Sequence, residues 1–160
     1  MTEWISLLAI AVALAMDAFA VAMVTGLTLR PLTGRHVFRL SFHFGLFQFI
    51  MPLMGWAAGS AVQKHIAAYD HWVAFALLAL VGGHMLHGAF VDKEVADRPA
   101  GDPTSGWTLV MLSIATSIDA LAVGLSLAII GTRILLPAAV IGVVAACFTV
   151  VGMVLGRQIG

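Results

Sequence analysis

Five stretches of more than 20 residues, each with at most one charged side chain, make up most of this 160-residue chain. They cover residues 4–29, 40–63, 71–91, 103–132 and 134–156. A helix needs about 20 apolar residues to cross roughly 30 Å of hydrocarbon, whereas the strands of a membrane barrel alternate over about 10 residues. Only helices and closed barrels satisfy their backbone groups in lipid. The sequence therefore predicts an all-α fold, a polytopic membrane bundle with five helices.

The composition agrees with a lipid bilayer as the surrounding solvent. Hydrophobic residues make up 61% of the chain and charged residues 10%, and the mean hydropathy is +1.04. The formal net charge is zero, so the charge balance gives no reason to expect a nucleic-acid partner. The single cysteine, Cys147, cannot form an internal disulfide and is interpreted as a packing residue.

The positions of the Lys and Arg residues predict the orientation, because basic loops favour the cytoplasmic side. Numbered along the chain, the first and third loops and the C-terminal tail share six basic residues: Arg30, Arg35, Arg39, Lys93, Arg98 and Arg157. The second and fourth loops contain Lys64 and Arg133. We therefore expect the N-terminus on the outer side, and the first and third loops in the cytoplasm.

The two halves of the chain contain an internal repeat. Residues 13–21 align with 115–123 at an offset of 102, sharing the aspartate, three alanines and the valine. Three glycines at positions 45, 55 and 59 match those at 142, 152 and 156 at an offset of 97. A unit of three helices inverts its second copy, so the pattern predicts the inverted repeat found in many secondary transporters.

This repeat predicts three parts: a first three-helix unit (1–91), a cytoplasmic linker loop (92–106) and a second unit (107–160) with two helices present. The linker is polar, contains Pro and Gly and has no apolar periodicity. No counterpart of the stretch 71–91 follows Gly160, so a sixth helix is missing from the expected 3+3 arrangement. We expect either that the chain is truncated or that a partner subunit, as in a homodimer, supplies that surface.

Asp17 and Asp119 each lie near the middle of an apolar stretch, at equivalent positions of the repeat. An aspartate at the centre of a membrane helix is unfavourable by about 2.5–3.5 kcal/mol. A protonated, structural aspartate could explain one such residue, but the duplication favours a functional site. None of the five stretches contains a Lys or Arg, so the counter-charge must be a proton or a bound cation. Carboxylate, carbonyl and hydroxyl oxygens suit hard cations such as Mg²⁺, Ca²⁺ or Mn²⁺.

Three further residues offer oxygen ligands for such a cation. Pro52 lacks an N–H, so the backbone carbonyl of Gln48 loses its helical partner, beside the amide oxygen of the same residue. Thr116 lies one turn before Asp119, and Ser117 is adjacent. Each has a structural alternative, because membrane hydroxyls commonly donate to the carbonyl four residues earlier and an amide can bond to a neighbouring helix.

Motifs along nearly the whole chain resemble the MntP family of manganese exporters, within the broader LysE-like transporter group. They are AMDAFAVA (15–22), FGLFQFIMPLMGWAAG (44–59), HWVAFALLALVGG (71–83), IATSIDALAVGLSLA (114–128) and VGMVLGRQIG (151–160). The resemblance implies a six-helix protein of the bacterial inner membrane that expels Mn²⁺, and the orientation predicted from the basic residues then places its N-terminus in the periplasm. It also implies that Asp17 and Asp119 are the important acidic residues, while some relatives have an acidic residue in place of Gln48.

The leading hypothesis is a secondary transporter, with no resident cofactor, that exports Mn²⁺ bound between Asp17 and Asp119. Its ligands would also include Gln48, Thr116 and Ser117, and protons could move in the opposite direction. One alternative is a LysE-like exporter of a cationic or zwitterionic amino acid. Another is an intramembrane aspartyl protease, but the contexts Met16-Asp17 and Ile118-Asp119 lack the Tyr-Asp and Gly-x-Gly-Asp patterns of those enzymes. We therefore predict a protein that is not an enzyme.

Overall fold

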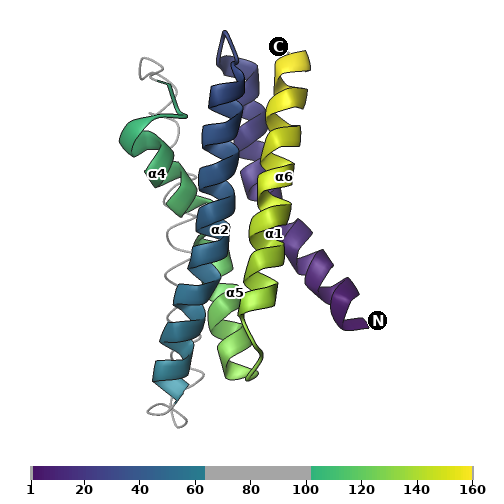
Figure 1. The fold of residues 1–160 in the computed structure, drawn as a ribbon, viewed down its shortest axis with the longest axis vertical. Helices are drawn as coiled ribbons and strands as arrows, with labels where there is room; N and C mark the ends of the chain where they lie inside the picture. Colours follow the sequence, from purple (N-terminus) through teal and green to yellow (C-terminus); the bar gives the residue numbers. More distant parts are fainter. Residues whose placement is uncertain (1, 64–101, 160) are drawn as a thin grey trace, which may run out of the picture.

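The computed structural model describes residues 2–63 and 102–159, and every element of regular secondary structure in these two segments is an α-helix (Figure 1). The helices are α1 (Thr2–Thr28), α2 (Gly34–Gln63), α4 (Gly106–Ala115), α5 (Ile118–Ile129) and α6 (Leu135–Ile159). Three of them, α1, α2 and α6, are long and apolar enough to cross a membrane, and the bent pair α4–α5 adds a fourth crossing if it forms one span. The predicted helical membrane bundle is confirmed, and the predicted stretch 71–91 lies outside the described residues.

Two helix boundaries differ from the prediction. Helix α2 begins at Gly34, before the apolar stretch that starts at residue 40, because Arg35 and Arg39 limit the apolar stretch without interrupting the helix. The stretch 103–132 was predicted to be one helix, and this is wrong. It forms two helices that bend by 42° at residues 116 and 117. Apolar length alone does not reveal such a break, because both halves remain apolar.

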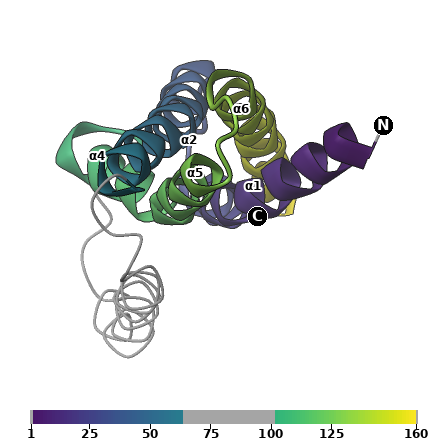
Figure 2. The same ribbon diagram turned by 90° about the horizontal axis from the view of Figure 1, so that it is seen from below.

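The helices form two parallel-running pairs. Helix α1 packs along α6, and α2 packs along both α5 and α6 (Figure 2). In Figure 1, α1 and α6 run in one direction along the bundle, while α2, α4 and α5 run in the other. Helix α1 therefore runs opposite to α4 and α5, its counterparts in the repeat, and α2 runs opposite to its counterpart α6. This is the arrangement that an inverted repeat predicts.

Small side chains bring these helices into close contact. Helix α1 buries a stripe of alanines that spans three turns: Ala11, Ala15, Ala18 and Ala22. A Cβ atom added to Gly152 of α6 would lie 2.7 Å from the carbonyl oxygen of Phe19 in α1. Membrane helices associate largely through such van der Waals contacts between small residues, because lipid provides no hydrophobic driving force between helices.

Four close glycine contacts form two pairs that follow the offsets of the repeat. A Cβ on Gly55 would meet the carbonyl oxygen of Leu121, and its counterpart Gly152 faces Phe19, the counterpart of Leu121. Likewise, Gly59 faces the carbonyl of Leu125, and Gly156 faces that of Met23. The helix contacts thus repeat as the sequence does. The division into units 1–91, 92–106 and 107–160 includes residues outside the described segments and stays a prediction.

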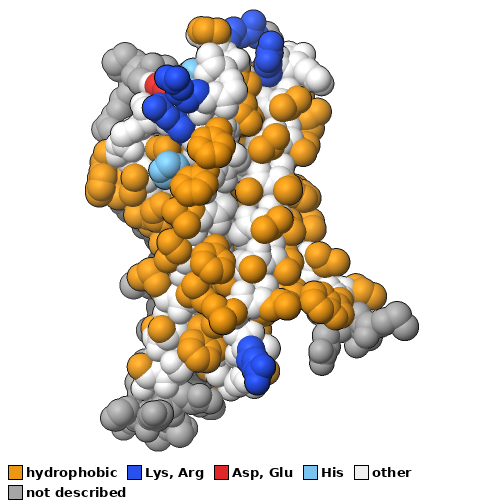
Figure 3. Space-filling view, in the orientation of Figure 1, with side chains coloured by type: hydrophobic (Ala, Val, Ile, Leu, Met, Phe, Trp, Pro, Cys, Tyr) orange, Lys and Arg blue, Asp and Glu red, His pale blue; other side chains and the backbone are white. Residues whose placement is uncertain are grey.

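The outer surface of the bundle is apolar along its sides, and Lys and Arg side chains gather mostly at one end (Figure 3). Large exposed hydrophobic residues include Ile5, Phe38, Trp107 and Val143. Arg30, in the loop after α1, and Arg157, in the last turn of α6, line the same cavity. The first loop and the C-terminal end of α6 therefore lie at one end of the bundle, as the alternating loop assignment predicts. Lys64, Lys93 and Arg98 lie outside the described residues.

The start of α2 is tied to the segment before α4 at this same end. His36 Nε2 lies 3.7 Å from Asp102 Oδ2, which is the one ion pair within residues 2–63 and 102–159. Thr104 donates to Asp102 Oδ1 from its hydroxyl (2.6 Å) and from its backbone N–H (2.9 Å). Burial opposes ionisation of Asp102, but the Thr104 hydrogen bonds and the charges of His36 and Arg39 hold its pKa below the usual value.

Candidate metal site

At the break between α4 and α5, side chains replace the backbone partners of two hydrogen-bonding groups. Helix α4 ends at Ala115 and α5 begins at Ile118. The Ala120 N–H donates to Asp119 Oδ1 at 2.8 Å, and the Thr116 carbonyl accepts from Gln48 Nε2 at 2.8 Å. Because these two backbone groups find side-chain partners, the helix can end and restart without leaving them unpaired.

Gln48 is fully buried in α2, one turn before the proline that the helix contains. Its Nε2 donates to the carbonyl oxygens of Thr116, at 2.8 Å, and of Leu14, at 3.4 Å. Residues 14 and 116 are separated by 102 positions, the offset of the repeat. A single amide thus joins equivalent carbonyls of the two halves, one on α1 and one at the helix break. For the nitrogen of Gln48, the structural alternative named above is therefore correct: it bonds to neighbouring helices.

Two buried polar oxygens near this point have no hydrogen-bond partner among the described residues. They are Oε1 of Gln48 and the hydroxyl of Ser117, which directly follows the Thr116 carbonyl at the break. A buried polar group without a partner is unfavourable by about 1–3 kcal/mol. Each therefore calls for a ligand, a water or an ion.

Thr116 differs from Ser117 in this respect. Its hydroxyl donates to the Leu112 carbonyl at 3.0 Å and also lies 3.2 Å from the Ser113 carbonyl. Ser113 itself donates to Leu109 at 2.7 Å. The structural alternative, a hydroxyl that donates to the backbone of its own helix, is therefore correct for Thr116. The hydroxyl oxygen still has lone pairs that could accept or coordinate. Of the two predicted hydroxyl ligands, only Ser117 is unpaired.

The two aspartates follow the bridged carbonyls by three residues each, Asp17 after Leu14 and Asp119 after Thr116. Asp119 is half-buried in the first turn of α5, whereas Asp17 is exposed on α1 within the part of the chain that the structure describes. The sequence predicts equivalent positions for the two carboxylates in the repeat, but their exposure differs among the described residues. The Asp17 charge acts on Asp119, and no basic side chain of the described segments does so.

The structure thus brings Gln48 of α2 to the helix break that contains Thr116 and Ser117, with Asp119 in the first turn of the helix that follows. Within residues 2–63 and 102–159, no cluster of three or more His, Cys, Asp or Glu side chains is present. A cation bound here would therefore need neutral oxygen ligands in addition to carboxylates. Sequence reasoning missed the break itself. The adjacent Thr116 and Ser117 were its available signal, because such residues favour helix ends.

A comparison with protein families matches residues 31–160 to the family described as "Putative manganese efflux pump". This chain belongs to the MntP family. An MntP relative from Syntrophotalea carbinolica is 61% identical over 99% of this chain and 84% of its own length. One from Citrifermentans bemidjiense is 60% identical over 99% of this chain and 84% of its own length.

A third MntP relative, from Nitratidesulfovibrio vulgaris, is 56% identical over 95% of this chain and 75% of its own length. Each of these three relatives is described as a "Putative manganese efflux pump MntP". No solved structure matches the chain. The family resemblance inferred from the motifs is therefore confirmed, and the family description agrees with a multi-pass membrane transporter.

Proposed function

We propose that this protein exports Mn²⁺ from the cytoplasm across the bacterial inner membrane as a secondary transporter. The observation that carries the proposal is the Gln48 amide that bridges the carbonyls of Leu14 and Thr116. Each of these residues lies three positions before an aspartate, Asp17 or Asp119, at equivalent positions of the repeat. Membership in the MntP family supports manganese as the transported substrate. Mn²⁺ is the substrate here, and the proposal needs no resident cofactor.

The proposed ligands match the chemistry of a hard divalent cation. The carboxylates of Asp17 and Asp119 would offset the two positive charges, and Gln48 Oε1 and Ser117 Oγ would supply the neutral oxygens that now lack partners. Thr116 could add a lone pair, and waters would complete a coordination shell of about six oxygens. The end of α4 adds the partial negative charge of a helix C-terminus, an arrangement that ion-binding transporters obtain from broken membrane helices.

We further infer that Gln48 alternates between the two halves of the protein during transport. Its amide is closer to the Thr116 carbonyl (2.8 Å), beside the broken helix, than to the Leu14 carbonyl (3.4 Å), beside the continuous α1. If the two repeats exchange conformations, α1 opens near Ala15 and the amide shifts toward Leu14. Such an exchange would expose the bound ion to the opposite side of the membrane.

Two further features complete the proposal. Protons entering from the outside would compete with Mn²⁺ for the carboxylates, because metal ligands must be deprotonated. This competition would couple export to proton entry. The N-terminus would lie in the periplasm, which places the end containing Arg30 and Arg157 in the cytoplasm. A homodimer and the supply of a sixth helical surface stay predictions.

The direct test is Mn²⁺ uptake into inverted membrane vesicles that contain the full chain. We expect uptake that depends on the protein and is not slowed by an excess of lysine or a neutral amino acid. An amino acid exporter would instead show competition, because an amino group would occupy the same carboxylates. Cleavage of a transmembrane peptide by the purified protein would favour the protease alternative and contradict transport as its role.

Replacing Ser117 with alanine is expected to have opposite effects on the free protein and on Mn²⁺ binding. Removal of an unpaired buried hydroxyl should leave the melting temperature of the metal-free protein unchanged or slightly higher. The affinity for Mn²⁺ should fall by about tenfold, because the variant loses one interaction with the ion that is about as strong as a hydrogen bond. Thermal melts with and without Mn²⁺ measure both quantities.

The matched control is Ser126→Ala, which removes an exposed hydroxyl bonded to the Ala122 carbonyl on the same helix. It should change neither quantity appreciably. Equal Mn²⁺ affinity in Ser117→Ala and the wild type would remove Ser117 from the proposed ligand set.

Replacing Gln48 with leucine is expected to reduce Mn²⁺ export by at least about tenfold. Leucine has a similar size but no donor, so the Thr116 carbonyl at the helix break loses its partner, at about 1–3 kcal/mol for an unpaired buried group, and the link to the Leu14 carbonyl is lost. Uptake into inverted vesicles, normalised to the amount of folded protein, measures the effect. Gln63→Leu, at the last residue of the same helix, serves as the control, and wild-type export by Gln48→Leu would refute the bridging role.

A further inference from the structure

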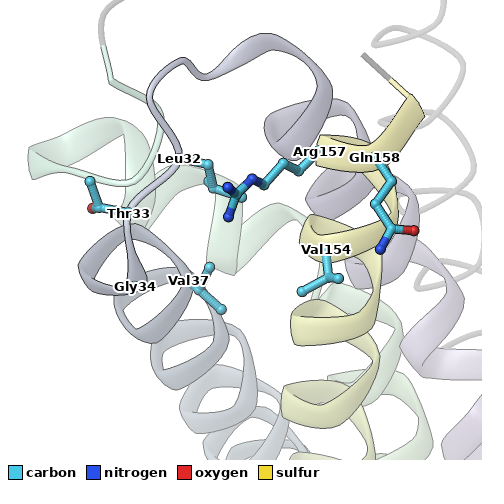
Figure 4. A pocket seen from close by; sticks show the side chains of 7 residues that line it. All are labelled: Leu32, Thr33, Gly34, Val37, Val154, Arg157 and Gln158. Carbon is cyan, nitrogen blue, oxygen red and sulfur yellow. The ribbon is translucent and has the colours of Figure 1, made fainter.

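A second charged region lies at the end of the bundle where the first loop meets the end of α6. Two cavities open here, of about 400 Å³ and about 510 Å³, and Leu32 and Arg157 line both of them. Arg30 lines the larger cavity. Figure 4 shows the Arg157 side chain extending from the last turn of α6 toward Leu32, so that its guanidinium lies in the smaller cavity.

Neither arginine has an ion-pair partner within residues 2–63 and 102–159, where the one ion pair joins His36 and Asp102. Arg30 follows α1 and Arg157 lies near the end of α6, and these two helices pack along each other. Both arginines therefore line the larger cavity, whose lining contains no carboxylate side chain. Guanidinium groups bind phosphate oxygens well, because their N–H donors match the geometry of two oxygens at once.

The surroundings of the cavities identify the source of such a phosphate. Both arginines lie at the ends of candidate membrane spans, where lipid headgroups are found. Val154 of α6 lines the smaller cavity and is exposed, and the sides of the bundle are apolar (Figure 3). Leu27, near the end of α1, and Leu155 of α6 are also exposed. An acyl chain could lie against these side chains while its headgroup occupies the larger cavity. A soluble phosphate would make no use of them.

We propose that Arg30 and Arg157 form a binding site for the phosphate group of an anionic phospholipid, between the first loop and the end of α6. Basic pockets between membrane helices on the cytoplasmic side bind such headgroups in other proteins. The site is separate from the aspartates, and it does not depend on the identity of the transported ion. A bound lipid would link the ends of α1 and α6, the two helices of one closely packed pair.

The test uses the purified full chain in detergent, titrated with phosphatidylglycerol, phosphatidylcholine or inorganic phosphate while its melting temperature is followed. Phosphatidylglycerol should stabilise the protein at lower concentrations than phosphatidylcholine does, and inorganic phosphate should not replace it. Each arginine should contribute about fivefold to the apparent affinity for phosphatidylglycerol. Arg157→Gln and Arg30→Gln should each lose that factor.

Arg35→Gln is the matched control, because Arg35 lies in the first turn of α2 at the same end of the bundle but does not line either cavity. It should keep the wild-type preference for phosphatidylglycerol. The proposal is overturned if Arg35→Gln loses as much affinity as Arg157→Gln, since surface charge alone would then explain binding. It is equally overturned if both cavity variants bind like the wild type, or if inorganic phosphate displaces the lipid.

Discussion

Replacing Asp119 with asparagine is expected to reduce Mn²⁺ export by about 100-fold or more. Substitution of residues that merely orient metal ligands lowers metal affinity or activity by about 10–100-fold, and a charged ligand should contribute at least the upper value. Asparagine keeps the size of the side chain and one oxygen but removes the charge. No basic side chain of the described residues acts on Asp119, and the remaining aspartate could offset only half of the charge on Mn²⁺.

Asp17→Asn should cause a loss of the same order, although Asp17 is exposed and Asp119 is half-buried in the described structure. Uptake into inverted vesicles and the growth of cells in excess Mn²⁺ both measure this loss. The matched control is Asp102→Asn, the same change at an aspartate of the loop before α4. It should export normally. Normal export by either membrane aspartate variant would refute the proposed site.

The second large effect is expected from a single methyl group at Gly55. Alanine normally stabilises a helix relative to glycine, by about 0.5–1 kcal/mol. At Gly55 the added Cβ would collide with the backbone carbonyl of Leu121, where α2 packs along α5. A backbone atom cannot move aside as a flexible side chain can, so we expect Gly55→Ala to destabilise the protein by about 3 kcal/mol, the upper end for overpacked interiors. The melting temperature should fall by about 6–12 °C.

Gly152→Ala tests the repeat-related contact, because Gly152 faces the Phe19 carbonyl as Gly55 faces that of Leu121. Gly152→Ala should also destabilise the protein. Its methyl group would push α6 away from α1, whereas that of Gly55→Ala would push α2 away from α5. Gly34→Ala is the control, since a Cβ there would meet nothing within 4 Å. Wild-type stability of both Gly55→Ala and Gly152→Ala would show that the helices do not approach each other as described.

Much of this arrangement can be predicted from the sequence, because charge-free length and repeated motifs have direct physical consequences. The apolar stretches predict the spans formed by α1, α2 and α6, and the offsets of 102 and 97 predict which glycines make equivalent contacts. Gln48 was identified from Pro52, one turn later. Its actual partners, Leu14 and Thr116, could not be predicted, because they depend on how three separate helices meet.

The helix break shows where sequence reasoning is limited. Residues 116 and 117 lie within an apolar stretch that is long enough for one helix, and hydropathy does not detect a bend there. The break depends on tertiary hydrogen bonds, since the Thr116 carbonyl accepts from a side chain of another helix. Two nearly identical motifs also could not predict that, among the described residues, Asp17 is exposed and Asp119 half-buried.

Equilibrium binding of Mn²⁺ to the purified full chain, followed through its melting temperature, tests the central claim most directly. At a Mn²⁺ concentration roughly 100 times the dissociation constant, the wild type should gain about 2.7 kcal/mol, or 5–10 °C in melting temperature. The gain should diminish as the pH is lowered, because protons compete for the carboxylates. Asp17→Asn and Asp119→Asn should show no gain under the same conditions, while Asp102→Asn should match the wild type. An undiminished Mn²⁺-dependent gain in Asp119→Asn would contradict the assignment of the metal site.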